Sequence, residues 1–247
     1  MIPTTEVMRA ASGEPIVLAL DSAGLGCSVL VAAGGTVLAA ERSAAMHGQA
    51  ERLLPMVDAV MRKSALSPAA LDIVATTTGP GSFTGIRVGL AAVRGIALAT
   101  GARSVGVTSF EAVAADLATK VSNRGDGFLL VALESRRHDF YIQLFDHACR
   151  PLCDPTAVMP AALGEALRGL IGRAPLVVAG DAAQRAADTL SAHSRAIVVD
   201  GSAPDAAGVL GAVLRRSRGG EGRLMPLPLY LRPPDVTVSM AHQGAGG

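Results

Sequence analysis

The sequence predicts an α/β protein in which a βββαβα unit occurs twice, so that two lobes each carry a mixed sheet. Two observations predict this duplication. First, β-patterned runs and segments of helical period follow in the same order before and after residue 108. Second, Ala-Leu-Asp-Ser at 19–22 is echoed by Ala-Leu-Glu-Ser at 132–135, each ending its half's first strand. Because half of the 247 residues are apolar, the chain can also bury a sizeable core.

In the first half, three β-patterned runs precede two segments of helical period. The links at 22–26 and 33–35 are rich in glycine and predict hairpin turns. The helix expected from Gln49 has apolar residues at helical spacing on one face. The expected elements are strands at 16–20, 27–32 and 36–41, a helix at 49–63, a strand at 73–78, a helix at 86–100 and a strand at 104–107.

The second half repeats this order and opens on a capping box formed by Thr108 and Glu111. The expected elements are a helix to about 120, strands at 128–133, 139–145 and near 156–159, a helix at 161–170, a strand at 176–179, a helix at 183–190, a strand at 196–199 and a helix at 205–216. We expect a first lobe of residues 1–107 plus 204–235, a second lobe of 108–203, and flexible segments at 1–14 and 236–247.

A duplicated unit of this kind is typical of the two-lobed actin-like (ASKHA, RNase H-like) fold. In that architecture the acid that ends each lobe's first strand faces the interlobe cleft. Asp21 and Glu134 are therefore candidates for holding a phosphate or a metal nucleotide. Alternatively, both acids only cap hairpins, since Asp and Ser hydrogen-bond turns locally. The residues alone leave both interpretations open.

The most informative segment is a glycine-rich turn within residues 76–89, Thr-Thr-Thr-Gly-Pro-Gly-Ser-Phe-Thr-Gly-Ile-Arg-Val-Gly. It predicts a tight turn between a strand and a helix, whose N-terminus could hold an anion. Alternatively, the turn only lets the strand run into a closely packed helix; neither P-loop nor nucleophile-elbow spacing is matched. The candidate cleft or anion-site residues are Asp21, Ser22, Gly79, Gly81, Ser82 and Glu134.

Composition narrows the classes of function. A net charge of +1 and a pI of about 7.8 lack the basic excess of a protein that holds nucleic acid unaided. Three cysteines without a secretory signal predict a reducing, cytoplasmic location. His147, Cys149 and Cys153 have no fourth ligand nearby, so we expect no metal site. We also find no apolar run approaching the length that crosses a bilayer, and expect no membrane partner.

Two helices have unusual sequences. The helix after the glycine turn contains Gly85, Gly89 and Gly95, although each interior glycine costs about 1 kcal/mol relative to alanine. The helix from Gln49 contains Pro55 and a second apolar face. Close packing against another helix would explain both features, and we expect Gly89→Leu or Ala92→Arg to abolish pairing with a partner in a folded chain. Alternatively, both helices only cover one face of the sheet.

Several motifs together resemble one family, TsaB (YeaZ). They are Asp21-Ser22 followed by Cys27-Ser28-Val29, His47-Gly48-Gln49 leading into Leu53-Leu54-Pro55-Met56-Val57, and residues 79–89. A thinner likeness covers Leu133-Glu134-Ser135-Arg136, Phe140-Tyr141 and Leu229-Tyr230-Leu231-Arg232.

The resemblance implies a non-catalytic subunit of the bacterial complex that makes threonylcarbamoyladenosine in tRNA. Its partners would be a catalytic paralogue (TsaD-type) and an ATPase subunit (TsaE-type), with a homodimer when alone and only indirect contact with tRNA. No cofactor would be held tightly, and ATP or ADP would bind only at the interface. The implied interface residues are Leu53, Met56, Val57, Val60, Gly85, Arg87, Gly89, Ala92, Val93 and Ile96.

The histidines agree with a chain that has no catalytic residues and no metal ligands of its own. The family's catalytic paralogue uses a His-x-x-x-His pair, and the five histidines here include no such pair. The alternative function is a small ATP-dependent kinase or ATPase on the same scaffold. A peptidase is a third possibility, but no Ser-His-Asp spacing supports it.

Overall fold

The fold is described from a computed structural model. The described residues are 13–24, 26–45, 48–120, 127–135, 137–172, 174–190, 196–200, 203–219 and 225–232. His47, which belongs to one of the family-like motifs, lies outside this part, as do most of the first predicted flexible segment and all of the second.

The first sheet has five strands in the order β3-β2-β1-β4-β5. Its strands β1 and β2 pair antiparallel, whereas β1 pairs with β4, and β4 with β5, in parallel, so the sheet is mixed. The elements of this half are β1 (Ile16–Asp21), β2 (Cys27–Ala33), β3 (Thr36–Ser43), α2 (Gln49–Lys63), the 3₁₀ helix η1 (Pro68–Ala70), β4 (Ile73–Thr77), α3 (Phe83–Thr100), β5 (Arg103–Val107) and α4 (Ser109–Lys120).

The second sheet has the order β10-β9-β6-β7-β8. Read from β8 to β10, this is the order of the first sheet read from β3 to β5, so the topology is repeated. The elements are β6 (Phe128–Glu134), β7 (Phe140–Phe145), β8 (Thr156–Val158), α5 (Pro160–Ile171), β9 (Leu176–Ala179), α6 (Ala183–Leu190), β10 (Ala196–Asp200) and α7 (Ala206–Gly219). The predicted duplicated fold with mixed sheets is therefore confirmed.

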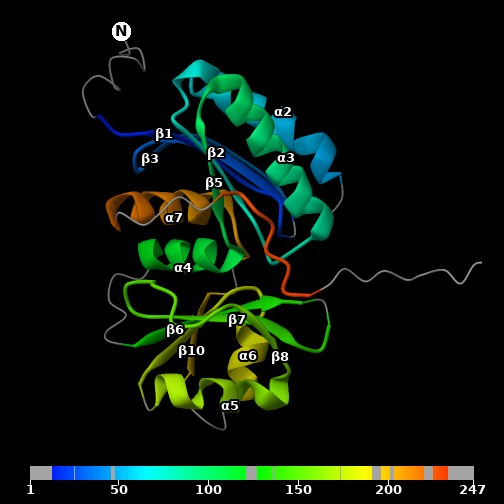
Figure 1. Cartoon of the computed structure of the whole chain (residues 1–247), viewed down its shortest axis with the longest axis vertical. Helices are drawn as coiled ribbons and strands as arrows, with labels where there is room; N and C mark the ends of the chain where they lie inside the picture. Colours follow the sequence, from blue (N-terminus) through cyan, green and yellow to red (C-terminus); the bar gives the residue numbers. More distant parts are fainter. Residues whose placement is uncertain are drawn as a thin grey trace, which may run out of the picture.

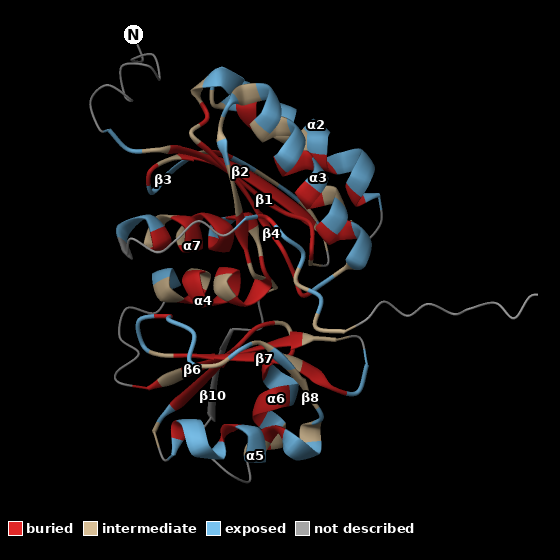
Figure 2. Cartoon of the chain, viewed as in Figure 1, coloured by how far each residue is buried: buried red, intermediate tan, exposed pale blue. Residues whose placement is uncertain are grey.

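From top to bottom in Figure 1 the layers are α2 with α3, the first sheet, α7, α4, the second sheet, and α5 with α6. Each of the two middle helices, α4 and α7, packs on the sheet of the other repeat. Helix α4 follows the first repeat but packs on the second sheet, where Phe110 and Leu117 join Phe145 in one core cluster. Helix α7 ends the second repeat but packs on the first sheet through Val209 and Val213. The strands and the helix faces toward them are buried, while the outer faces of α2, α3 and α5 are exposed (Figure 2).

Helix α3 begins three residues earlier than the apolar pattern predicted. Ser82 is its N-cap, and its side-chain oxygen accepts a hydrogen bond from the N–H of Gly85 at 3.2 Å. A capping side chain satisfies a backbone donor that the helix leaves unpaired, so the helix can start directly at the turn. The capping box of Thr108 and Glu111 is also present, with the Thr108 N–H donating to the Glu111 carboxylate at 2.8 Å.

Candidate functional site

The glycine turn packs against the hairpin loop that follows β1. The Ser82 N–H donates to the Ala23 carbonyl at 2.8 Å, and the Ser22 hydroxyl donates to the Gly85 carbonyl at 2.8 Å. A Cβ at Gly81 would collide with the Ala23 carbonyl. Gly79 has a φ of 105°, which glycine adopts without strain, and a Cβ there would lie 2.9 Å from the Leu229 carbonyl oxygen. These contacts support the interpretation that the turn serves close packing, while the anion site stays a prediction.

Two of the helix glycines face inward rather than toward a partner. A Cβ at Gly85 would collide with the Ser22 carbonyl, and one at Gly89 would lie 2.7 Å from Thr76 Oγ1 and 2.8 Å from Ser22 Oγ. Only Gly95 is open, with no atom within 4 Å of a Cβ built on it. We therefore revise the expectation for Gly89→Leu: the larger side chain would destabilise the lobe itself, so that loss of pairing would not show an interface.

Some of the other implied interface residues are buried in the lobe, and the rest are partly or fully exposed. Leu53, Val60 and Val93 are 0 % exposed and Ala92 is 9 % exposed; all belong to the core between the helices and the first sheet. They cannot contact a partner in this conformation, because the chain's own strands already surround them. Met56, Val57 and Ile96 are partly exposed at the edge of that core, and Arg87 is exposed.

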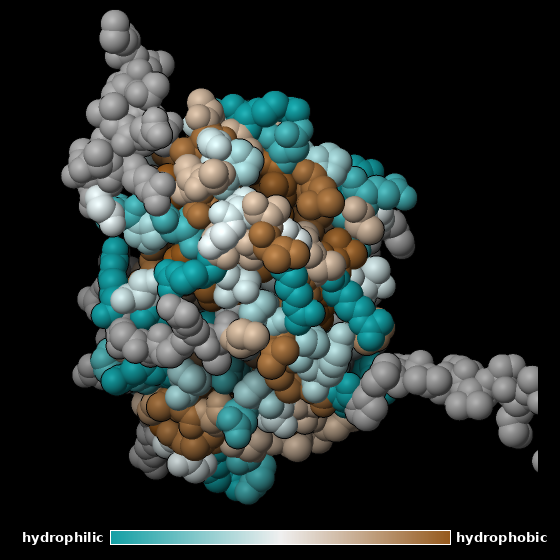
Figure 3. Space-filling model, turned by 45° about the horizontal axis from the view of Figure 1, so that its top comes forward, coloured by the Kyte–Doolittle hydropathy of each residue, from teal (hydrophilic) through white to brown (hydrophobic). Residues whose placement is uncertain are grey.

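The outer face of α2 and α3 exposes apolar side chains that are not among the implied interface residues. Leu54 is 54 % exposed and Leu98 is 89 % exposed, on α2 and α3 respectively. Small residues, Ala91, Gly95 and Ala99, are also exposed on α3. Figure 3 brings the top of the molecule forward and shows hydrophobic residues among polar ones over the lobe that carries these helices.

Helix α3 is apolar enough, by length and composition, to cross a membrane, which corrects the statement that no apolar run approaches this length. Its 18 residues have a mean hydropathy of 1.3, yet only 28 % of the window is buried. In the folded lobe its inner face is fixed by Gly85 and Gly89 against the β1–β2 loop and β4. The outer face of this helix therefore exposes apolar and small residues, Leu98 among them, beside Arg87 and Arg94.

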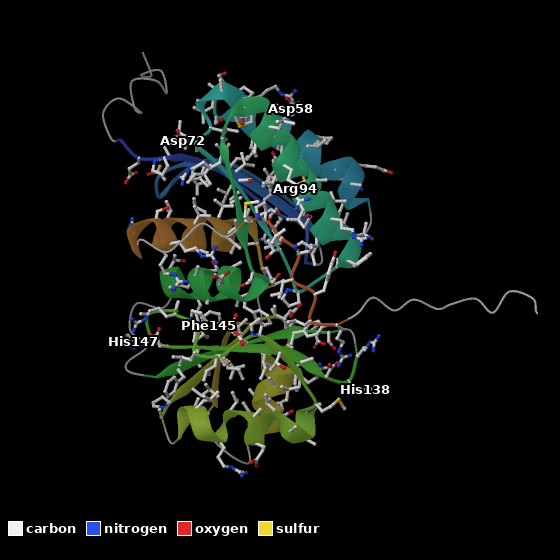
Figure 4. All side chains as sticks on the ribbon, in the orientation of Figure 1. Asp58, Asp72, Arg94, His138, Phe145 and His147 are labelled. Atoms are coloured by element: carbon white, nitrogen blue, oxygen red, sulfur yellow. The ribbon has the colours of Figure 1, made fainter. Side chains whose placement is uncertain are left out.

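A C-terminal segment, Met225–Arg232, lies beside α3 and continues to the second lobe; we call it the strap. The Arg94 guanidinium, labelled on α3 in Figure 4, donates to the Pro226 carbonyl at 3.0 Å, and the Leu229 N–H donates to the Thr78 carbonyl at 2.8 Å. At its far end Arg232 forms an ion pair with Asp139, whose side chain is 2 % exposed. No periodic signal in the sequence predicted this role, and the family-like motif at 229–232 did not indicate it either.

Phe83 holds the strap at the N-terminus of α3. Its ring centroid lies 5.4 Å from that of Tyr230, at an interplanar angle of 36°, and the Arg87 guanidinium lies 3.6 Å from the Phe83 centroid. Such aromatic and cation–π contacts contribute about 0.5–1.5 kcal/mol each. The predicted interface residue Arg87 is therefore already engaged with a ring of its own helix.

The two candidate cleft acids have different surroundings. Asp21 is 3 % exposed and accepts hydrogen bonds from the Thr77 hydroxyl at 2.6 Å and the Ala23 N–H at 3.3 Å. Burial raises the pKa of Asp21 to about 6, partly offset by the Thr77 hydroxyl, and the charge of Asp205 raises it further. A cavity of about 410 Å³ lies beside Asp21 and Asp205. A carboxyl in this position is close to half protonated near pH 6.

Glu134 lies in a more open environment and is ion-paired. Its carboxylate is 3.0 Å from the Arg185 guanidinium, and its backbone N–H donates to Asp181 at 2.9 Å. None of the three described cavities is lined by both Asp21 and Glu134. Within the described residues no three His, Cys, Asp or Glu side chains gather as metal ligands. Cys149, one of the residues weighed as a metal ligand, is buried and donates its thiol to the Ala114 carbonyl at 3.3 Å.

The family model described as "TsaD: tRNA N6-adenosine threonylcarbamoyltransferase" matches residues 38–161. The chain is 34% identical over 126 residues to the tRNA threonylcarbamoyladenosine biosynthesis protein TsaB of Escherichia coli, covering 51% of this chain and 52% of that protein. The chain belongs to the TsaB (YeaZ) family.

Two further relatives extend the match along the chain. An uncharacterised protein of Mycobacterium bovis is 32% identical over 191 residues, which cover 77% of this chain and 78% of that protein. The structure of YeaZ from Pseudomonas aeruginosa superposes with a TM-score of 0.73 at 23% identity, over 88% of this chain and 100% of that chain. The second likeness shows a shared fold. The alignment with the E. coli protein spans only about half of its length.

Proposed function

We propose that this TsaB-family chain acts in threonylcarbamoyladenosine modification of tRNA as a non-catalytic subunit that docks on a catalytic, TsaD-type paralogue. The E. coli relative is named for this biosynthesis, and the family model that matches half of the chain is described as the transferase itself. A chain that shares a transferase's fold but has no His-x-x-x-His pair suits a partner of the enzyme.

The observation that carries the docking role is the uneven burial of α3. Its 18 residues are apolar overall, yet only 28 % of them are buried. Next to it, α2 exposes Leu54 and the half-buried Met56 and Val57. Exposed apolar helix faces of this kind are typical of surfaces that become buried on assembly. The contact would use these outer residues, with Leu53, Val60 and Val93 supporting them from inside.

The remaining partners are also proposals. A homodimer through the same face would cover it when the paralogue is absent, because a self-complementary helix pair can serve both assemblies. The ATPase (TsaE-type) subunit would join the pair, ATP or ADP would bind only at the joint interface, and tRNA would be contacted mainly by the partner. The complex would work in the cytoplasm, where its tRNA substrate is found.

A pairing experiment tests the proposal. The purified chain is mixed with the paralogue of its own genome and followed by size-exclusion chromatography and calorimetry. Leu54→Glu and Leu98→Glu, both at exposed positions, should weaken pairing at least tenfold, because each places a charge within the apolar contact. Leu170→Glu on α5, also exposed, is the matched control and should pair normally. Wild-type affinity in both test variants would refute docking through this face.

The kinase alternative is tested separately by calorimetry with Mg-ATP. A kinase should bind the nucleotide strongly in the isolated chain. The proposed subunit should show no Mg-ATP binding that depends on Asp21 until the paralogue is added. Tight binding by the isolated chain, lost in Asp21→Asn, would favour the kinase.

A further inference from the structure

We propose that a cavity between the glycine turn, the β6–β7 hairpin and the strap binds a planar, negatively charged ligand, the nucleoside monophosphate unit, either free or within a single RNA strand. The proposal goes beyond the docking role, because the cavity is formed within one chain and away from the outer face of α2. It also does not involve Asp21 or Glu134.

The size of the cavity suits such a ligand. It measures about 390 Å³, inside the range of about 300–1,000 Å³ that small-molecule pockets occupy. Its walls come from three segments that are distant in sequence: Pro80 and Gly81 of the turn, Ser135 and Arg137 of the hairpin, and the strap from Leu229. Sites where two lobes meet are common positions for ligand pockets.

Aromatic rings are concentrated at this cavity. The chain has two tyrosines and no tryptophan, and both Tyr141 and Tyr230 line the cavity together with Phe83. Phe83 contacts both Tyr230 and the Arg87 guanidinium, so the Tyr230 ring has a fixed neighbour. A positioned ring is a platform on which a flat base can stack.

The charge of the lining selects an anion. Arg137 and Arg232 line the cavity, and the residues described as lining it include no acid. Asp139 lies behind Arg232 and forms an ion pair with it; the Ser135 hydroxyl also donates to Asp139 at 2.6 Å. A guanidinium has five N–H donors in a planar fork, so Arg232 can be held by Asp139 at one edge and still present other donors. Arginine side chains of this kind bind phosphate oxygens well.

Binding to the full chain alone tests the proposal, so its failure is distinguishable from failure of pairing with the paralogue. The probes are AMP, adenosine, inorganic phosphate and a single-stranded RNA pentamer, measured by calorimetry. AMP or the pentamer should bind saturably and at least tenfold more tightly than adenosine or phosphate. Preference for the pentamer over AMP would identify an RNA strand as the source of the ligand, and the reverse would identify a free nucleotide.

Variants of residues that line the cavity test whether the ligand binds there. Tyr230→Ala should weaken binding at least fivefold through lost stacking, and Arg137→Ala, at an exposed position, should do so through lost charge. Arg168→Ala on α5, which removes an exposed arginine far from the cavity, is the control and should bind normally. No saturable binding of AMP or RNA, phosphate binding as tight as AMP, or unchanged affinity in both variants would each overturn the proposal. If Tyr230→Ala proves unfolded by circular dichroism, Arg137→Ala decides.

Discussion

The two lobes share one strand order, yet they differ at equivalent positions. The first strand of each repeat ends in an acid, Asp21 in β1 and Glu134 in β6. Asp21 is buried beside neutral donors and a second acid, whereas Glu134 is partly exposed and paired with Arg185. A duplicated scaffold therefore does not imply duplicated chemistry, because the neighbours of each acid set its charge state.

The outer helices differ in the same way. In the first lobe α2 and α3 have 15 and 18 residues, while their counterparts α5 and α6 have 12 and 8. Helix α3 is fixed through two inward glycines and extends an apolar face outward. The longer pair presents the larger surface to a partner, and the shorter pair mainly covers its own sheet. The first lobe is thus the one suited to assembly.

The largest effect is expected at the inward face of α3. Gly89→Leu places a side chain where Thr76 Oγ1 and Ser22 Oγ already lie within 2.8 Å of a Cβ. Overpacking of a buried site typically costs about 1–3 kcal/mol. Because the α3 backbone at Gly89 lies directly against the sheet, we expect a loss of about 3 kcal/mol or more in the free energy of unfolding. Urea denaturation measures it. A variant as stable as the wild type would show that α3 can move away from the sheet.

The second prediction concerns Asp21 and the pH dependence of stability. Its folded pKa of about 6 lies above the usual aspartate pKa of 3.8. Between these values the folded chain keeps a proton that the unfolded chain has released, so the free energy of unfolding falls as pH rises through this window and then levels off. The shift corresponds to about 3 kcal/mol at most.

Asp21→Asn removes the titration while its amide oxygen can still accept from Thr77. Above pH 6 the variant should be more stable than the wild type, because the wild-type carboxylate is then charged and buried while the amide is neutral. The stability of the variant should change little between pH 4 and 6.5. Burial raises the pKa values of Asp139 and Asp146, but hydrogen bonds from Ser135 and Arg150 respectively lower them by more, so both pKa values lie below the usual aspartate range. These two acids therefore do not titrate between pH 4 and 6. Glu134→Gln, at the equivalent position, should change stability by less than about 1 kcal/mol, since its ion pair is partly exposed. An unchanged pH profile in Asp21→Asn would contradict the assignment.

Much of the fold could be predicted from the sequence, because strand and helix periods are local signals. The turn at Gly79 was also recognisable, since it depends on residue type, whereas the start of α3 directly after Ser82 was not. The orientation of α3 was not: glycines and apolar residues on a helix show that something packs closely, without showing whether it is the chain's own sheet or a partner. Gly85, Gly89, Leu53 and similar positions therefore proved internal.

The role of the strap was harder to predict, because its contacts depend on the packed lobes. Arg94 donates to the carbonyl of Pro226, and Arg232 pairs with Asp139, across sequence separations that no local pattern records. The cavity beside the strap could not be predicted for the same reason. Tyr141 lies in β7 and Tyr230 in the strap, and they line one cavity only when the chain has folded.

The third prediction tests whether the strap joins the two lobes. Arg232→Ala leaves the buried carboxylate of Asp139 without its cation, although Ser135 still donates to it. We expect a loss of about 2 kcal/mol, within the range for an acceptor deprived of one partner. Hydrogen exchange should accelerate at the Leu229 amide, which bonds the Thr78 carbonyl. Arg168→Ala, in an exposed pair on α5, is the control and should lose less than about 0.5 kcal/mol. Unchanged exchange in Arg232→Ala would mean that the apolar contacts of Leu229 and Leu231 hold the strap alone.

The smallest effect is expected at the outward face of α3. Gly95→Ala adds a methyl group where nothing lies within 4 Å, so it should stabilise the isolated chain by about 0.5–1 kcal/mol through helix propensity alone. The same substitution at Gly89 should destabilise, and the opposite signs would separate the two faces of one helix. In the complex with the paralogue the gain at Gly95 should disappear if a partner helix packs there, because the methyl group would then meet a neighbour. Equal stabilisation of the free chain and the complex would place the contact on α2 and on the Phe83 end of α3.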